Sequence, residues 1–173
     1  MIVSRRLPDH TFVAGLFLID IYCLGVKDVF LRVFNEHEYD DLKTKVSENT
    51  PMRAVTAPYA RKLAEEAVAY AHQLGFEPPR DYRSTAVIFS DINPAECTDE
   101  FVFGKDGKPF YVRGPGENTS RADRIVKQLT ARCGRDGFHF IVGGPEGERD
   151  EADGEFNGDL DVDSDEEEDS DEA

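Results

Sequence analysis

The residues with the clearest chemical potential lie in one apolar stretch near the N-terminus, FLIDIYCLGVKD, from Phe17 to Asp28. Its polar side chains are two carboxylates, a thiol and an amine: Asp20, Cys23, Lys27 and Asp28. A cysteine acts as a nucleophile when a base lies within hydrogen-bond reach and its surroundings favour the thiolate. A hydrolase that draws on these four residues and a distant histidine is therefore one hypothesis.

The same stretch also fits a core strand, and we favour this structural interpretation. In a strand, Asp20 and Tyr22 share one face while Cys23 points to the other, so the thiol and the carboxylate diverge. A buried cysteine is normally a small hydrophobe, and a buried aspartate must be paired or hydrogen-bonded. The candidate partners for Asp20 are Lys27, Arg5 and Arg6.

A second candidate site is a basic face on the helix expected over residues 120–133. At about 100° per residue, its cations fall on one side and its apolar residues on the other. The cations are Arg121, Arg124, Lys127, Arg132 and, just beyond the helix, Arg135. Such a row can neutralise phosphates. However, residues 1–145 carry nineteen Lys and Arg against twenty Asp and Glu, and this balance favours a solvated face over a dedicated nucleic-acid binder.

The glycine-rich stretch RGPGENTSRADRI, residues 113–125, precedes this helix and has some features of an anion site. Free N–H groups at a helix N-terminus attract anions. However, the stretch lacks both phosphate-loop glycine patterns, and Glu117 and Asp123 oppose an anion. A plain strand-to-helix connection is the favoured interpretation. Cys97 and Cys133 stand alone without metal-ligand spacing, so no metal and no cofactor is expected.

The net charge of −16 comes almost entirely from residues 146–173, which hold sixteen acidic residues and Arg149. Such a segment cannot bury enough apolar surface to fold and is expected to be a disordered acidic tail. It can maintain solubility, bind a basic partner, or compete with polyanions for the basic helix of its own domain. Asp159 to Asp165 resemble a calcium loop only weakly, since Ser164 replaces the required glycine.

The expected fold class is α+β, a small mixed or antiparallel sheet with three to four helices packed on it, in one domain over residues 1–145. Strands are expected over 1–7, 11–24 and 138–142, with a hairpin over 101–112 that turns at Asp106-Gly107. Residues 26–34 fit either a strand or a helix.

Capping signals mark the expected helices. Asn35 and Glu38 form a capping box for a helix that ends before Pro51. Thr56 can cap a helix over 57–74 that Gly75 ends, while Ser120 and Asp123 are the expected capping pair of the helix over 120–133. Residues 81–91 favour a helix over a strand.

Three phrases, FLIDIYCLGVKD, AVAYAHQLGFEPPRDY and FVFGKDGKPFYV, resemble landmarks shared by a group of uncharacterised bacterial proteins. They are spread over residues 1–145, and the tail lies outside them. The resemblance implies a bacterial origin and one shared domain, and it transfers no activity and no catalytic residue.

An odd number of cysteines, three, without a secretory signal favours reduced thiols in the cytoplasm. The longest apolar run, residues 12–24, is shorter than the about 20 residues of a membrane-spanning helix, so no membrane association is expected. The leading hypothesis is a non-enzymatic module that binds another macromolecule, with a protein as the favoured partner. Nucleic-acid association through the basic helix is the alternative, the hydrolase is a third, and the oligomeric state stays open.

Overall fold

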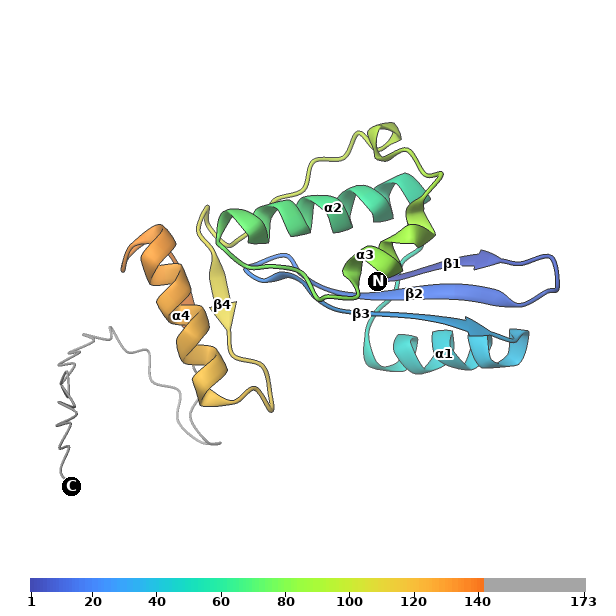
Figure 1. Cartoon of the computed structure of the whole chain (residues 1–173), viewed down its shortest axis with the longest axis horizontal. Coiled ribbons are helices and arrows are strands. Elements are labelled where there is room, and N and C mark those ends of the chain that lie inside the picture. The colour runs from blue at the N-terminus through green and yellow to red at the C-terminus, as the bar shows by residue number, and fades with distance from the viewer. Residues whose placement is uncertain (142–173) are drawn as a thin grey trace, which may run out of the picture. The chain divides into compact units, whose positions relative to one another are not determined.

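A computed structural model of the chain describes residues 1–141, and the predicted acidic tail lies outside the described residues. The fold is α+β, as predicted (Figure 1). Its helices are α1 (Glu36–Asn49), α2 (Ala57–Gln73), α3 (Tyr82–Thr85) and α4 (Thr119–Cys133), with 3-10 turns η1 (Ala86–Phe89) and η2 (Pro94–Glu96). No helix within residues 1–141 combines the length and the apolar character needed to cross a membrane.

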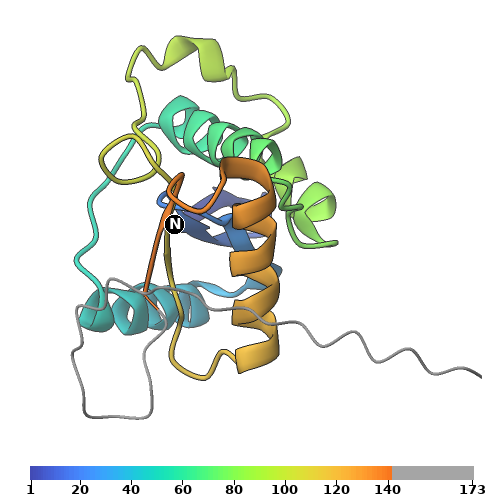
Figure 2. The ribbon, with the colours of Figure 1, turned by 90° about the vertical axis from the view of Figure 1, so that its left-hand side faces the viewer.

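The main sheet is antiparallel and has the strand order β1-β2-β3, formed by β1 (Ile2–Arg6), β2 (Phe12–Asp20) and β3 (Gly25–Phe34). The segment 26–34, for which the sequence allowed either a strand or a helix, is therefore a strand. In both views α2 lies above this sheet and α1 below it (Figures 1 and 2). A separate parallel pair joins β4 (Phe110–Val112) to β5 (His139–Ile141).

The prediction that the second strand runs to Leu24 is wrong, because β2 ends at Asp20. The Asp20 carboxylate accepts hydrogen bonds from the backbone N–H groups of Tyr22 at 2.9 Å, Cys23 at 3.2 Å and Leu24 at 3.3 Å. An aspartate that binds the following backbone favours a turn over a continued strand. The polar group inside the apolar stretch is thus satisfied locally.

Two of the predicted helix starts are confirmed. Asn35 and Glu38 make the reciprocal bonds of a capping box at α1, and the Thr56 side chain accepts from the Tyr59 N–H at α2. The predicted cap of α4 is wrong, because the Asn118 side chain accepts from the Arg121 N–H at 2.8 Å. Asn118 is extended and immediately precedes the helix, whereas Ser120 is already helical.

The predicted hairpin over 101–112 is present only as its turn. Asp106 and Gly107 have positive φ, and one isolated bridge joins Lys105 to Lys108. The preceding aromatic side chains pack on α2, with Phe101 against Tyr59 and Phe103 against Tyr70. Contact with α2 therefore replaces pairing across the turn, and the strand after it pairs with β5. The helix expected over 81–91 forms as α3 followed by η1.

The buried side chains form two clusters. One lies between the sheet and the helices above it and comprises Phe17, Val26, Ala60, Ala64, Ile88 and Phe89. The other joins the end of α2 to α4 and β4, and comprises Cys23, Leu24, Leu74, Tyr111, Ala122, Ile125, Leu129 and Phe138. The start of β3 approaches α2 closely at Gly25, where a Cβ would lie 2.5 Å from the Ala67 carbonyl oxygen and 2.6 Å from the Ala71 Cβ.

Candidate binding groove

Three of the four polar residues of the opening stretch lie close enough to interact, since Asp20 and Lys27 both act electrostatically on Cys23. Cys23 is fully buried, and burial, followed by the nearby Asp20 carboxylate, raises the pKa of its thiol to about 12. The Asp28 carboxylate accepts from the Val29 N–H at 2.9 Å, and Lys27 lines a surface groove. A buried thiol with a raised pKa stays protonated at neutral pH, which is the opposite of what a thiolate nucleophile needs.

The four histidines lie against other residues. His37 and His72 face carboxylates, Asp41 at 3.8 Å and Glu77 at 3.3 Å. His10 contacts Arg6 at 3.1 Å, and the His139 ring lies edge-on to Phe110. Within residues 1–141, none of the hydrogen bonds, ion pairs or ring contacts of the histidines involves Cys23 or Asp20, so the geometry does not assemble a base beside the thiol.

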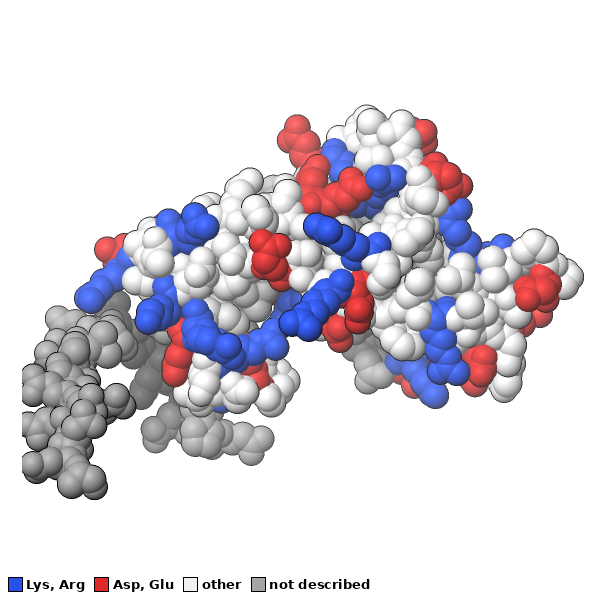
Figure 3. Space-filling view, viewed as in Figure 1, with Lys and Arg blue, Asp and Glu red and all other residues white. Residues whose placement is uncertain are grey.

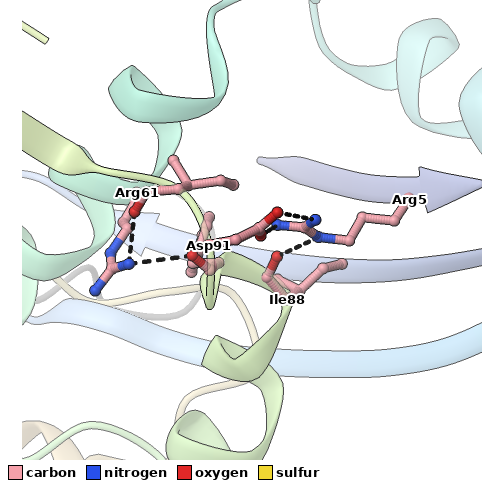
Figure 4. Close-up of polar contacts among 6 residues, drawn as sticks. Arg5, Arg61, Ile88 and Asp91 are labelled. Carbon is pink, nitrogen blue, oxygen red and sulfur yellow. Dashed lines mark hydrogen bonds and ion pairs between the residues drawn. The ribbon is translucent and has the colours of Figure 1, made fainter. Parts of the chain in front are cut away.

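Arg5, a suggested partner of Asp20, instead contacts Ile88 and Asp91 (Figure 4). Its guanidinium forms a two-point ion pair with Asp91 and donates to the Ile88 carbonyl at 2.7 Å. Arg61 approaches the same loop and donates to the carbonyls of Phe89 at 3.1 Å and Ile92 at 2.6 Å. The two arginines therefore fix the loop between η1 and η2 against β1 and α2.

Arg61 also borders a cavity of about 310 Å³. The other lining residues are Glu65, Val68, Tyr82, Ala86, Phe89 and Ser90. Arg61 pairs with Glu65 at 2.7 Å as well as with the two carbonyls, so the hydrogen-bonding capacity of this cation is largely used within the fold. We assign this cavity no binding role.

The glycine-rich stretch before α4 folds around Glu117. Its carboxylate accepts from the Tyr111 hydroxyl at 2.9 Å and the Gly114 N–H at 3.2 Å, and it pairs with Arg121 at 3.0 Å. Burial alone would raise the pKa of Glu117, but these hydrogen bonds, with Lys27 and Arg121, hold the pKa below its ordinary value. The Glu117 carboxylate thus occupies the position at the start of α4 where an external anion would bind. This agrees with the interpretation of the stretch as a strand-to-helix connection.

A groove of about 530 Å³ lies between the start of β3, the segment after α2, and the N-terminal half of α4. Three cations line it: Lys27, Arg121 and Arg124. Its apolar lining comprises Leu24, Val26, Phe76, Pro79 and Ile125, and Gly75, Glu77 and Gln128 complete it. Figure 3 shows Lys and Arg side chains gathered over α4 on this face of the molecule. The groove thus combines positive charge with apolar surface.

Packing between distant segments makes this groove. The Gln128 side-chain amide donates to the Leu74 carbonyl at 3.1 Å and holds α4 against the end of α2. Gly75, with φ of 84°, ends the helix there, and a Cβ on it would lie 2.0 Å from the Gln128 amide nitrogen. The absence of a side chain at Gly75 therefore leaves room for the Gln128 amide to reach the Leu74 carbonyl.

The structure divides the predicted basic residues into two sets. Arg121 and Arg124 line the groove, whereas the lining does not include Lys127, Arg132 or Arg135. Arg124 donates only to the Ser120 carbonyl of its own helix, at 3.2 Å. The other three are exposed and have no hydrogen bond or ion pair within residues 1–141.

Sequence reasoning missed the meeting of Lys27 and Phe76 with α4. The sequence pattern suggested Lys27 as a partner for Asp20 and as part of a hydrolase site. No local pattern links Lys27 or Phe76 to α4, which lies far along the chain. The chain matches no protein-family model, no curated protein and no solved structure at a significant level.

Proposed function

We propose that this protein is a non-enzymatic binding module whose groove takes an acidic polypeptide segment of a partner protein. The observation that carries this proposal is the placement of three cations around a partly apolar lining: Lys27 and Arg124, which make no ion pair within residues 1–141, and Arg121, whose Nε pairs with Glu117. A guanidinium binds a carboxylate through two parallel hydrogen bonds, which gives direction as well as charge attraction. An acidic peptide offers several such carboxylates.

The apolar lining favours a polypeptide over a bare polyanion. Phe76 and Pro79, both half-buried, present hydrocarbon surface that an aliphatic or aromatic side chain of a peptide can cover, while the buried Leu24, Val26 and Ile125 form the floor beneath them. A sugar-phosphate backbone gains little from such surface and depends on the number of phosphates that it contacts.

The test is fluorescence anisotropy of the full chain with a short labelled Asp/Glu peptide that contains leucines. We expect Arg124→Glu and Lys27→Glu each to weaken binding by about tenfold or more, because each reverses a groove charge. Lys127→Glu is the matched control, since it makes the same charge change on α4 outside the groove. Serines in place of the peptide leucines should also weaken binding if the apolar lining is used.

Random single-stranded DNA and RNA form the second arm of the experiment, across a salt series. The proposal fails if these bind more tightly than the peptide and if Lys127→Glu and Arg132→Glu weaken binding as much as Arg124→Glu does. That result would assign the basic face of α4 to nucleic acid. A chain that ends at Gly143, checked for folding by thermal melting, would show whether the acidic C-terminal segment competes with either ligand.

A further inference from the structure

The free edge of the main sheet is the strongest unexplained feature of the described chain. Within residues 1–141, β3 pairs with β2 alone. Its apolar side chains are nevertheless open to solvent, with exposed fractions of 49% for Phe30, 40% for Leu31 and 52% for Val33. A long apolar edge strand is a template for pairing with another strand.

The hydrogen bonds of β2 indicate which backbone N–H and carbonyl groups of β3 are free to pair with another strand. The Phe17 N–H donates to the Met1 carbonyl, so the backbone groups of Phe17 point towards β1. Because backbone groups alternate in direction along a strand, the N–H and carbonyl of Leu16 point towards its β3 partner, Phe30. The even-numbered residues of β3 therefore bond to β2, and the N–H and carbonyl groups of the odd-numbered residues face outward. The contact of the Val29 N–H with its neighbour Asp28, away from β2, agrees with this assignment.

Phe30 lies on the sheet face that α1 covers only in part. Phe12 is opposite Phe34, so Phe12 and Phe30 share this face. Tyr39 of α1 stacks on Phe12 and bonds Ser4 of β1, while Glu38 of α1 lies 3.8 Å from the Arg32 guanidinium in a largely exposed ion pair. Phe30 keeps an exposed fraction of 49% beside these contacts, so the outer edge at Phe30 is accessible to another strand.

We propose that a second copy of this chain pairs with β3 in antiparallel fashion, centred on Phe30. This register places Asp28 opposite Arg32 of the partner subunit, and the twofold axis repeats the same pair in reverse. Phe30 then meets Phe30 of the partner subunit, and the outward-facing Val29 meets Leu31 of the partner subunit. The two three-stranded sheets join into one continuous sheet.

Charge complementarity selects this register from its neighbours. Only registers that match odd with odd residues satisfy the outward-facing N–H and carbonyl groups. A shift by two residues in one direction places Asp28 opposite Phe34 of the partner subunit, which leaves the carboxylate unpaired. A further shift of two places Arg32 opposite Arg32 of the partner subunit, and like charges directly opposite one another are destabilising.

The test measures the mass of the full chain by sedimentation and by light scattering over a concentration series. We expect a concentration-dependent dimer, twice the 19.4 kDa of one chain. Arg32→Asp and Asp28→Arg should each raise the dissociation constant by about tenfold or more, since each places like charges opposite one another twice. The double variant Asp28→Arg with Arg32→Asp restores both pairs and should restore the dimer.

Disulfide trapping tests the register independently. In this pairing the Phe30 positions of the two subunits form a non-hydrogen-bonded pair with close Cα atoms, which suits a disulfide. With oxidised glutathione, Phe30→Cys should give a covalent dimer, whereas Val33→Cys and the parent chain should not. The proposal is overturned by a monomer at every concentration, by a dimer that the single charge variants leave unchanged, or by equal trapping at positions 30 and 33.

Discussion

The cations near the main sheet and the cations of α4 have opposite roles. Near the sheet, Arg5 and Arg61 donate to backbone carbonyls of the loop at 88–92, and Lys62 donates to those of Cys97 and Asp99. On α4, Arg124 in the groove donates only to the Ser120 carbonyl of its own helix, and Lys127 and Arg132 outside the groove are exposed without a partner in the described chain. The same residue types thus hold the fold together in one region and remain available for binding in the other.

The difference follows from what each side chain can reach. The irregular loop after η1 contains carbonyls that no helix or sheet satisfies, and buried carbonyls need a donor. The carbonyls of α4 are bonded within the helix, so its cations are not drawn to nearby backbone; within residues 1–141 only Arg121 among them pairs with a carboxylate, that of Glu117. Residue type alone therefore does not distinguish a structural cation from a binding cation. The distinction depends on whether backbone carbonyls that need a donor lie nearby.

The largest effect is expected for Arg61→Ala. It removes the donors to two loop carbonyls and leaves these acceptors without their charged partner, so the free energy of unfolding should fall by about 2–3 kcal/mol. Urea unfolding measures the change. A loss below about 0.5 kcal/mol, the range of ordinary surface substitutions, would show that the cation is not structural and would break the comparison.

Glu117→Gln should have the next largest effect, about 1–2 kcal/mol at neutral pH, because a charge-assisted acceptor at the start of α4 is lost. Because folding lowers the pKa of Glu117, its stabilising contribution is complete at neutral pH and is lost as the pH falls below about 4. Urea unfolding of both proteins from pH 7 to pH 3 should show the difference between them shrinking. A constant difference would contradict this linkage.

Cys23→Ala should cost about 1 kcal/mol, since it removes one buried atom from a packed cluster. In the native protein the raised pKa and full burial should protect Cys23 from iodoacetamide at pH 8, while the half-buried Cys133 reacts faster. Peptide mass spectrometry after labelling identifies the modified thiols. Rapid native labelling of Cys23 would revive the nucleophile hypothesis.

Arg124→Ala should have the smallest effect on stability, within about 0.5 kcal/mol, because its side chain bonds only to its own helix. Its effect on binding of the acidic peptide should nevertheless be clear. Together, Arg61→Ala and Arg124→Ala would compare a structural cation with a binding cation. Equal losses of stability for the two would remove the distinction between them.

Local signals predicted much of the fold. The Asn35–Glu38 box and the Thr56 cap act within three residues, and both helices begin where these signals place them. The apolar face of α4 follows helical periodicity. Such features depend on neighbours in sequence, so they can be read without the tertiary structure.

The wrong predictions arose where two local signals competed or where a distant partner decided. Asn118 and Ser120 are both good caps, and the choice depended on where the helical backbone begins. Phe101 and Phe103 have strand-forming character, but α2 offers them aromatic partners. Propensity is a weak guide at such places because tertiary contacts override it.

The sequence by itself determined the α+β class, the main helices and the charged face of α4, since periodicity and caps act over a few residues. Only the tertiary structure decided the environment of Cys23, the separate tasks of the arginines, and the meeting of Lys27 with Arg121 and Arg124 in one groove. These features depend on burial and on contacts between segments far apart in the chain. Local sequence patterns do not predict these contacts, because the contacts form only when the helices and strands pack together and exclude water.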